Sequence, residues 1–545
     1  MSNVIINSII DLKNLVEPVN GQVVEVLSYN PLSANEKEFF GGGLFIYSTE
    51  NLDENEVDVF TSLNSLGVWK RIKRDNEYDI TWGGAKGGVS INDPLEDESE
   101  KCQKVFDAAG IQGRIKIPKR VFYVPAGLQL YHQQSIVGVG SQSSILLGNG
   151  SAAVIKTNTS ITGKVRNLSL LDLGINNFSK TPTGVVGSHA VQWWAANDSH
   201  IQRCEIQSRY KEALHVKYSY RGSITQNRIT SSGDTFAFAM INNCNGIDAS
   251  NNTISGGTAG RGVRVGMSQS INLANSVIEV SSGTAVQIGG DDGEDGGICC
   301  GINLTGLYAE QCKRVLEAGL KFECYDIQLT GFRINQKSDS PVKPYEEALH
   351  LGRVNGLTFF GGAADSDNTV AFVKLYNKAA GVGITPFLSG SILKTKALVG
   401  YIYPYFSFDD NTSVFQSRIF GKCEISLNSD EILGCNQEFI SDFIECKESL
   451  DLQYIVPPSL FGGTIQGIDI INAKGVLEGV VEIGSEVSVV ETLSIDLATI
   501  STILGHKNLL TESANKFIRS SGLTLRFRAV TNSTSKFRLK VRYRS

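Results

Sequence analysis

The sequence predicts an all-β protein built around a right-handed parallel β-helix, a solenoid of short strands, followed by a C-terminal antiparallel β-sandwich domain. Three observations lead to this fold class. The 545 residues include 56 Gly but only 12 Pro, which is typical of many short strands joined by tight turns. Short apolar segments recur at a nearly constant spacing, and only one segment of the chain has a convincing helical pattern.

Similar apolar segments repeat through the middle of the chain. Their first apolar residues are 23 residues apart at the start and up to 31 residues apart later: Ile201, Ile224, Ile247, Ile271, Ile302, Ile327 and Leu357. Periods of 20–50 residues indicate stacked repeats. Each repeat contains further short strands in which alternate residues, such as Leu214 and Val216, fall on one face. Three short strands per turn predict a parallel β-helix over residues 76–400, and Asn and Gly between the strands suit its left-handed corners.

The two ends of the chain do not follow this repeat. Residues 1–75 contain a Gly-rich and acidic stretch that predicts a separate N-terminal module. Residues 96–110 predict a short amphipathic helix, which we expect to cover the first coil because terminal repeats need a cap. Residues 401–545 contain longer alternating strands such as "KFRLKVRYRS" and predict a C-terminal β domain.

Composition excludes several classes of partner. The 50 Lys and Arg and 56 Asp and Glu leave a net charge of −6, so we expect no nucleic acid or anionic membrane as a partner. No apolar run is long enough to cross a membrane, and residues 1–11 lack the pattern of a secretory signal. The 10 Cys contain no CxxC pair, which indicates reduced, buried thiols folded in a reducing cytoplasm. No nucleotide, haem or flavin motif is present, so no cofactor is expected.

Two segments resemble bacteriophage tailspike proteins. Residues 39–60, "FFGGGLFIYSTENLDENEVDVF", followed by "GVWKR", are similar to the module that precedes the β-helix in many tailspikes. Residues 78–130 resemble the entry segment of pectate-lyase-like tailspike domains. They keep Gly84-Ala85, the Gly87-Gly88 turn, the helix and "IPKRVFYV", but lack the paired Asp that this family usually has at the turn.

The resemblance implies a homotrimer on the phage virion that binds, and usually cleaves, a polysaccharide of the bacterial surface. It implies that residues 1–75 attach to other tail proteins, that residues 76–400 hold the catalytic site, and that residues 401–545 serve trimerisation or glycan binding. The protein would then be made in the host cytoplasm without a signal peptide and act outside the cell. We therefore expect a capsular or O-antigen polysaccharide depolymerase.

Glycoside hydrolysis needs two carboxylates, and a β-helix places equivalent positions of successive coils about 4.8 Å apart. Aligning the coils gives one outward column: Gln207, Thr230, Ser255, Glu279, Glu310 and Asn335. Glu279 and Glu310 are therefore the candidate catalytic acid and the base or nucleophile. The alternative is that both are ordinary solvated glutamates.

The insertion "GGDDGEDGG" at residues 289–297 provides a second set of acids. Asp292 and Asp295 lie on this Gly-rich loop and are candidates for the second catalytic carboxylate. The spacing does not match a calcium loop, so we expect no metal site there. A solvated acidic loop is the simpler interpretation.

A neighbouring outward column carries His215, Arg264 and Gln287. Arg264 suits a sugar carboxylate because a guanidinium binds it with two hydrogen bonds. In a polysaccharide lyase, the rival enzyme class, it would lower the pKa of the proton next to a uronic acid carboxylate or act as the base itself. An ion pair between coils is the alternative for Arg264, and a surface imidazole that takes no part in catalysis is the alternative for His215.

Aromatic side chains are the last group of candidates, because a pyranose ring stacks on an indole or a phenol. Trp193, Trp194 and Tyr210 lie in the densest aromatic cluster. Adjacent residues of a strand point to opposite faces, so only one of the two Trp side chains can face outward. Subunit packing is the alternative to sugar contact, and a non-catalytic receptor-binding spike would use the same aromatic groups.

Overall fold

The computed structural model describes residues 4–354 except 33–37, 75, 94, 158–163, 179–186, 234, 258–259, 280–282, 290–296, 337–347 and 353. Beyond residue 354 it describes only the backbone of the strands. Contacts divide the chain into a first unit, residues 1–264 with 268–282, and a second unit, residues 265–267 with 283–545. Each unit is described by itself. In the described part of the chain no helix is long and apolar enough to cross a membrane.

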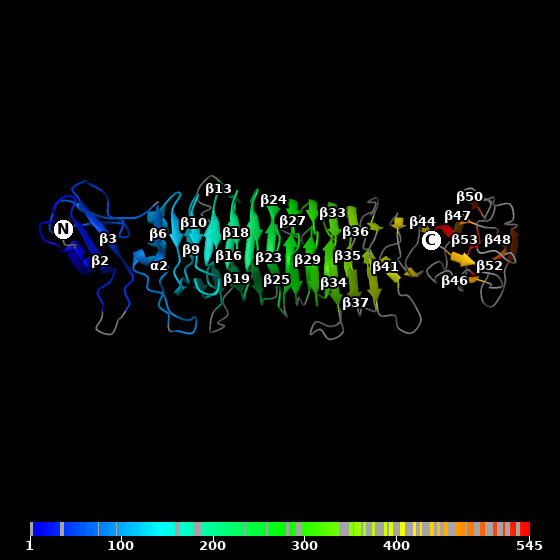
Figure 1. The fold of residues 1–545 in the computed structure, drawn as a ribbon, viewed down its shortest axis with the longest axis horizontal. Helices are drawn as coiled ribbons and strands as arrows, with labels where there is room; N and C mark the ends of the chain where they lie inside the picture. The colour runs from blue at the N-terminus through cyan, green and yellow to red at the C-terminus, as the bar shows by residue number, and fades with distance from the viewer. Residues whose placement is uncertain are drawn as a thin grey trace. The chain divides into compact units, whose positions relative to one another are not determined.

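The first unit begins with a small β module (Figure 1). Its sheet has the strand order β1-β2-β3-β5-β4. β1 and β2 are parallel, and the other neighbours are antiparallel. The strands are β1 (Val4–Ser8), β2 (Val23–Ser28), β3 (Gly41–Ser48), β4 (Val59–Thr61) and β5 (Val68–Arg71), and helix α1 (Ile9–Lys13) follows β1.

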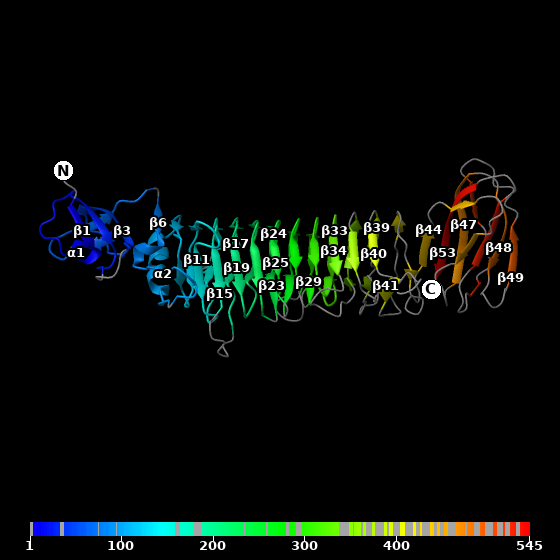
Figure 2. The ribbon, with the colours of Figure 1, turned by 60° about the horizontal axis from the view of Figure 1, so that its bottom comes forward.

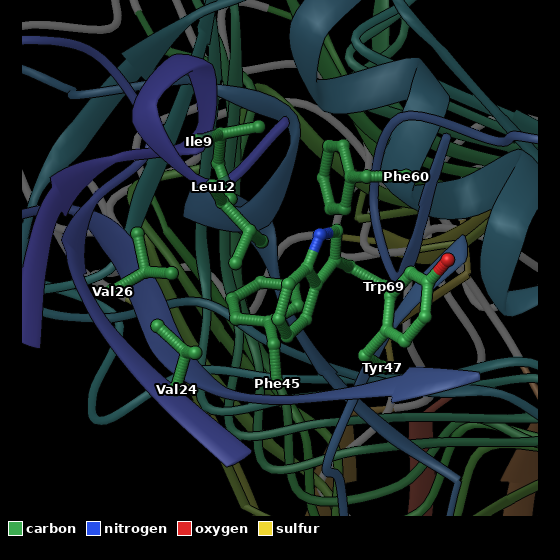
Figure 3. Packing of buried hydrophobic residues seen from close by; sticks show 8 residues of the cluster. All are labelled: Ile9, Leu12, Val24, Val26, Phe45, Tyr47, Phe60 and Trp69. Carbon is green, nitrogen blue, oxygen red and sulfur yellow. The ribbon is translucent and has the colours of Figure 1, made fainter. Parts of the chain in front are cut away.

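This module has its own hydrophobic core, formed by α1 and strands β2 to β5 (Figure 3). Beside it, the buried guanidinium of Arg71 lies 4.5 Å from the centroid of the Phe45 ring and 4.4 Å from that of Trp82. It donates hydrogen bonds to the carbonyl oxygens of Val57, Gly42 and Gly41. Burial lowers the pKa of Arg71 to about 9, and the carboxylate of Asp58 opposes this effect.

Three parallel sheets make up the rest of the first unit, and their strands stack in successive coils (Figures 1 and 2). Sheet 1 contains β6 (Glu77–Asp79), β7 (Arg114–Lys116), β10 (Ser135–Val137), β14 (Ser169–Leu171), β18 (His200–Gln202), β21 (Ser223–Thr225), β24 (Asn245–Asp248) and β27 (Gln269–Asn272). Sheet 2 contains β8 (Val121–Tyr123), β11 (Ile145–Gly148), β15 (Gly174–Asn177), β19 (Glu205–Ser208), β22 (Arg228–Ser231), β25 (Thr253–Ser255) and β28 (Val277–Glu279). Sheet 3 contains β9 (Leu128–Leu130), β12 (Ile155–Thr157), β16 (Val191–Trp194), β20 (Leu214–Lys217), β23 (Phe236–Ile241) and β26 (Arg261–Val265). A short pair, β13 (Val165–Arg166) with β17 (Ala196–Asn197), joins two corners.

The second unit contains the same three kinds of parallel strand. In sheet 1 they are β30 (Cys299–Asn303), β33 (Cys324–Thr330), β36 (Val354–Phe360), β39 (Pro386–Ser389) and β42 (Arg418–Phe420). In sheet 2 they are β31 (Tyr308–Glu310), β34 (Arg333–Gln336), β37 (Ala363–Ser366) and β40 (Ile392–Thr395). In sheet 3 they are β29 (Thr284–Ile288), β32 (Arg314–Ala318), β35 (Leu349–Leu351), β38 (Val373–Leu375), β41 (Pro404–Phe408) and β43 (Ser426–Leu427). Parallel pairing therefore extends beyond residue 400, where the sequence placed the end of the solenoid.

The remaining strands pair antiparallel in two sheets. They are β44 (Asn436–Ile440), β45 (Ile444–Cys446), β46 (Leu452–Ile455), β47 (Thr464–Lys474), β48 (Leu477–Ile483), β49 (Glu491–Ile495), β50 (Gly505–Asn508), β51 (Lys516–Phe517), β52 (Thr524–Ala529) and β53 (Ser535–Arg544). The antiparallel pairing agrees with the sequence pattern of this region. The packing of the two sheets as a sandwich stays a prediction.

The predicted repeat is confirmed by the strand register. Ile201 pairs with Ile224 in the next coil, and Ile247 pairs with Ile271. The solenoid is therefore a parallel β-helix whose interior is formed by stacked aliphatic side chains, including the buried Leu214. Its corners contain non-Gly residues with positive φ, such as Asn167, Asn242, Asn243, Asn251 and Asn275, as the Asn content predicted.

Buried polar groups also stack along the solenoid. The Asn252 Nδ2 atom donates to the carbonyl of Ile224 at 2.7 Å, and the backbone N–H of Asn227 donates to Asn252 Oδ1 at 2.9 Å. Asn227 Nδ2 in turn donates to the carbonyl of Ile201 at 3.0 Å. Both Asn side chains are almost fully buried. We call this pair the asparagine ladder, because its hydrogen bonds connect three successive coils.

Helix α2 (Ser99–Ala109) lies at the first coils, as predicted for a cap (Figure 1). Cys102, Val105 and Phe106 form its buried face. The buried Gln134 side chain donates to the carbonyls of Phe106 and Gly110. A residue of the first coils therefore supplies hydrogen bonds to the carbonyl groups at the C-terminal end of the helix.

The turn before helix α2 is stabilised by an acidic residue other than the paired Asp that pectate-lyase-like tailspike domains usually have there. The buried Glu98 carboxylate accepts hydrogen bonds from the backbone N–H groups of Lys86 at 2.6 Å and Gly87 at 3.1 Å. Glu98 therefore holds the Gly87-Gly88 turn, which lacks the family's paired Asp.

The buried thiols agree with the sequence interpretation. Burial raises the pKa of Cys204 to about 12 and that of Cys244 to about 11, so both stay protonated at neutral pH. The free and buried cysteines in the described part of the chain are Cys102, Cys204, Cys244, Cys299, Cys312 and Cys324.

Candidate functional site

The predicted outward column on sheet 2 exists in the first unit. Gln207 pairs with Thr230, Thr230 with Ser255, and Ser255 with Glu279. All four side chains are half-buried, whereas the preceding residue of each strand points into the solenoid. Asn176 of the preceding coil pairs with Gln207 and extends the column. The column therefore presents amide, hydroxyl and carboxylate groups on one face.

The same position in the second unit begins with Glu310. Glu310 pairs with Asn335, whose Nδ2 atom donates to Glu310 Oε1 at 3.0 Å. Tyr308 precedes it on the same face, and the guanidinium of Arg333 lies 5.4 Å from the Tyr308 ring centroid. Burial raises the pKa of Tyr308, and Glu310 adds to this effect, so the phenol stays protonated. Because Glu279 and Glu310 belong to different units, their direct pairing stays a prediction.

The second predicted column, on sheet 3, is more buried than expected. His215 is only 6% exposed, so it is not the surface imidazole that the sequence suggested. Its register partners are Gln192 and Ala239. The rings of His189 and Trp194 contact the His215 ring, with centroids 4.1 and 5.9 Å from its own. Arg264 is half-buried, with its guanidinium 5.6 Å from the centroid of the Phe236 ring.

His215 belongs to a compact polar cluster that the sequence did not predict. Its ring stacks on the ring of His189, with centroids 4.1 Å apart and planes inclined by 22°. His189 Nδ1 lies 3.1 Å from Glu212 Oε2, and the Thr235 hydroxyl donates to Glu212 Oε1 at 3.0 Å. We call Glu212, His189 and His215 the histidine cluster.

Electrostatics in the histidine cluster favour one protonation pattern. Burial and, to a smaller extent, the neighbouring His189 together lower the pKa of His215 to about 3, so the His215 ring is neutral at pH 7. Burial raises the pKa of Glu212, but the hydrogen bond and charge of His189 outweigh this and lower it to about 2. Glu212 is therefore ionised. The cluster pairs a buried carboxylate with an imidazole that can accept a hydrogen bond.

The two adjacent Trp side chains point to opposite faces of their strand, as predicted. Trp193 is 2% exposed and packs inside the solenoid, whereas Trp194 is half-buried and faces outward. Trp194 Nε1 donates to His215 Nδ1 at 3.4 Å, so the histidine cluster orients the indole. Tyr210 is half-buried, and its ring fills the space beside Gly150 and Gly187.

Gln287 belongs to a second polar cluster, in the second unit. It pairs with Glu317, which pairs with His350 on the next coil. The Thr284 hydroxyl donates to Glu317 Oε2 at 2.6 Å, and Arg314 Nη1 donates to Glu317 Oε1 at 2.6 Å. Glu317 is 6% exposed. This carboxylate is buried and satisfied, which is typical of a structural role.

The remaining candidates lie outside the described residues. Asp292 and Asp295 belong to the segment 290–296, of which nothing is described. Within the residues that the structure describes, no group of three or more His, Cys, Asp and Glu is arranged to hold a metal ion.

Sequence reasoning missed Glu212 and Glu317 because it aligned carboxylates on one column only. The signal that would have found Glu212 is its place in "YKEALHV", three residues before His215. Glu317 would have required the register of sheet 3, in which it lies opposite Gln287. His189 precedes its strand and has no recognisable pattern.

Comparisons with known proteins give one family match. Residues 5–74 match the family described as the phage tail protein small four-stranded beta-sheet domain. This segment is the N-terminal module, whose sheet here has five strands. No curated protein matches the chain.

Several solved structures are similar to the chain at low sequence identity. The tailspike protein of Acinetobacter baumannii phage AM24 is 14% identical over 99% of this chain and 93% of that chain, with a TM-score of 0.49. The tailspike gp49 of Acinetobacter baumannii bacteriophage Fri1, titled a capsular polysaccharide depolymerase, is 12% identical over 99% and 98%, with a TM-score of 0.41. The catalytic unit of an alpha-1,3-glucanase from Streptomyces thermodiastaticus is 12% identical over 67% and 74%, with a TM-score of 0.41. The resemblance to phage tail proteins is thus confirmed by the family match over residues 5–74, which a parallel β-helix follows in the chain.

Proposed function

We propose that this protein is a phage tailspike that binds a bacterial capsular or O-antigen polysaccharide and cleaves it internally by glycoside hydrolysis. In this proposal residues 1–75 attach the protein to other virion tail proteins, and three copies assemble into a homotrimer. The protein then acts outside the host cell, at its surface. The match of residues 5–74 to a phage tail domain supports the place on the virion.

The observation that carries the enzymatic part is the polar column on sheet 2. Asn176, Gln207, Thr230, Ser255 and Glu279 follow one another in register on one outward face. Successive coils place such groups about 4.8 Å apart. A polysaccharide carries hydroxyl groups along its whole length, so a row of hydrogen-bonding side chains is suited to hold it.

In this proposal two carboxylates provide the chemistry: Glu279 of this column and Glu310 of the second unit, which the sequence alignment places at the equivalent position. One of Glu279 and Glu310 protonates the glycosidic oxygen as it leaves, while the other attacks the anomeric carbon or activates water. The hydrogen bond from Asn335 at 3.0 Å fixes one oxygen of Glu310 and leaves the other for the substrate. Carboxylates on adjacent coils fit the separation of about 5–5.5 Å of a retaining enzyme. Asp292 and Asp295 remain candidates for the second carboxylate.

One observation favours a lyase as the second candidate. His215 is held neutral, and a neutral imidazole is the form that acts as a base in β-elimination. Arg264 would neutralise the uronic acid carboxylate in that reaction. The burial of His215 counts against this role, because a base must reach the proton that it removes.

The test is cleavage of purified capsular polysaccharide by wild type, Glu279→Gln and Glu310→Gln. We expect each variant to lose about 100-fold or more in the release of new reducing ends, because general acid–base catalysis contributes that much. Glu100→Gln is the matched control: Glu100 is an exposed acid of helix α2. Wild-type cleavage with unchanged rates in both column variants would contradict the assignment of Glu279 and Glu310. A product that absorbs in the ultraviolet would indicate a lyase, and binding without cleavage would indicate a receptor-binding spike.

A further inference from the structure

We infer that the polysaccharide which this protein cleaves is acidic, and that Arg333 binds the carboxylate of the sugar held next to Glu310. Arg333 forms a site with Tyr308, Glu310 and Asn335, which we call the arginine subsite. The inference rests on the proposed function, because it takes the ligand to be the polysaccharide that reaches Glu310. It adds the class of substrate and a residue that determines specificity.

The arginine subsite is a continuous patch on the outward face of sheet 2. In the register of β31 and β34, Tyr308 pairs with Arg333 and Glu310 pairs with Asn335. The residue between them on each strand is buried, 1% and 2% exposed. Because alternate residues of a strand point to opposite faces, all four side chains point outward together. Neighbouring strands lie about 4.8 Å apart and two residues along a strand span about 6.6 Å, so the patch has roughly the size of one sugar ring.

The guanidinium of Arg333 is held by an aromatic ring. It lies 5.4 Å from the centroid of the Tyr308 ring, and Arg333 is exposed whereas Tyr308 is half-buried. A guanidinium stacks on an aromatic face and is attracted to it electrostatically. This contact restricts the Arg333 side chain before a ligand arrives, which lowers the entropic cost of binding.

The charge of Arg333 is not used by an ion pair among the residues that the structure describes. Arg203 and Arg221 differ, because each donates two hydrogen bonds of 2.7 and 2.9 Å to an Asp of the preceding coil. The acid of the subsite, Glu310, accepts a hydrogen bond from Asn335 Nδ2 at 3.0 Å. Arg333 is therefore available for a carboxylate from outside the chain, which a guanidinium binds with two parallel hydrogen bonds.

The position of Arg333 determines which sugar carries the carboxylate. Arg333 lies two residues before Asn335, the residue that binds Glu310. A sugar whose glycosidic oxygen reaches Glu310 therefore presents its substituents to Arg333. Without this cation, a carboxylate on that sugar would be repelled by the negative charge of Glu310. Arg264, the sequence candidate for binding a sugar carboxylate, lies on sheet 3 and not in this patch.

Affinity gel electrophoresis with capsular polysaccharides, run in the cold to slow cleavage, tests this inference. The polysaccharides are purified from a panel of encapsulated strains, and each is used as it is and after chemical reduction of its carboxylates to alcohols. We expect the polymer that retards the wild type most strongly to carry carboxylates. Its reduction should weaken retardation about tenfold, the effect of losing a hydrogen bond between charged groups. Added salt should weaken retardation as well, because exposed charges are screened.

Three variants assign this preference to Arg333. Arg333→Gln should bind the native polymer about tenfold more weakly, and reduction of the polymer should then weaken its binding less than it weakens that of the wild type. Arg333→Lys keeps the charge but not the planar pair of donors, so we expect an intermediate affinity. Arg261→Gln is the matched control and should bind as the wild type does, because Arg261 is also exposed and lies 5.3 Å from the Phe236 ring centroid, but on sheet 3.

A purely structural role of Arg333 has a different readout. Arg333 would then pair with an acid of the next coil, in which Asp365 is in register with Asn335. In that case Arg333→Gln would lower the melting temperature and leave the preference for the native polymer unchanged. We expect the reverse, an unchanged melting temperature and a lost preference.

Two results would overturn the inference: the polymer that the wild type binds best is neutral, or reduction weakens the binding of Arg333→Gln as much as that of the wild type. Failure of the proposed function has a different signature. If Glu310→Gln still cleaves capsule while Arg333→Gln loses its preference for the native polymer, the catalytic assignment fails and the role of Arg333 in binding stands. If no polysaccharide retards the wild type, the proposed function and the inference both fail.

Discussion

Replacement of Asn252 by Ala tests whether the asparagine ladder holds the coils of the first unit together. The Asn252 side chain makes three buried hydrogen bonds: to the Ile224 carbonyl at 2.7 Å, from the Asn227 N–H at 2.9 Å and from Asn227 Nδ2 at 3.1 Å. Asn252 is 1% exposed and Asn227 is 3% exposed. Water therefore cannot replace these bonds without local opening.

The magnitude follows from the groups left without partners. In Asn252→Ala the Ile224 carbonyl and the Asn227 N–H stay buried and lose their hydrogen bonds. Each such group costs about 1–3 kcal/mol, so the two together should destabilise the coil by about 2–6 kcal/mol. At about 3 kcal/mol, opening of the coil becomes more than about 100-fold more frequent.

Hydrogen exchange measured by mass spectrometry on the intact protein is the assay. Peptides that span residues 220–230 should exchange more than about 100-fold faster in Asn252→Ala than in wild type. Asn92→Ala is the control, because Asn92 is exposed and such substitutions change stability by about 0.5 kcal/mol or less. Exchange of this segment within about threefold of wild type would refute the role of the ladder.

Three further predictions concern stability. The pKa of His215 is lowered from 6.5 to about 3, so its neutral form stabilises the fold fully above pH 6.5. This stability is lost as the pH falls from 6.5 toward 3. The melting temperature should therefore fall over this range, and it should fall less in His215→Phe. Arg71→Leu leaves the carbonyls that Arg71 binds without donors, so we expect at least about 3 kcal/mol of destabilisation confined to the N-terminal module; retained exchange protection of β3 would contradict it. Gly127→Ala places a Cβ against the Ala153 carbonyl at a backbone φ of 74°. The first coils should therefore unfold at a lower temperature in calorimetry. An unchanged unfolding temperature would show that this turn can shift to accept the Cβ.

Much of the fold could be predicted from the sequence because a solenoid is periodic. The nearly constant spacing of Ile201, Ile224 and Ile247 is enough to predict stacked coils, because each coil contacts only its neighbours. The helix before the first coil could be predicted for the same reason, because an open coil needs a cover. The alternation in "QWW" likewise determined that one Trp faces inward and the other outward.

The polar clusters could not be predicted in this way. His189 precedes strand β16, Glu212 lies in the turn before strand β20, and His215 lies on β20. The three side chains meet although no sequence period relates these positions. The sequence placed His215 at the surface, whereas neighbouring groups enclose it. Burial depends on everything that surrounds a side chain, and a single strand's pattern shows only which face it points to.

The order of residues alone was enough to predict the repeat, the outward position of Glu279 and Glu310, and the N-terminal module that resembles phage tail proteins. The repeat and the outward positions depend on local alternation and on a constant spacing, both of which can be counted along the chain, whereas the module was identified by the resemblance of its residues. The folded chain was needed to show that Asn335 binds Glu310, that His215 is buried and neutral, and that Lys217 lies over Trp194. Such contacts join residues more than 20 positions apart, and they exist only after the register of neighbouring coils is set.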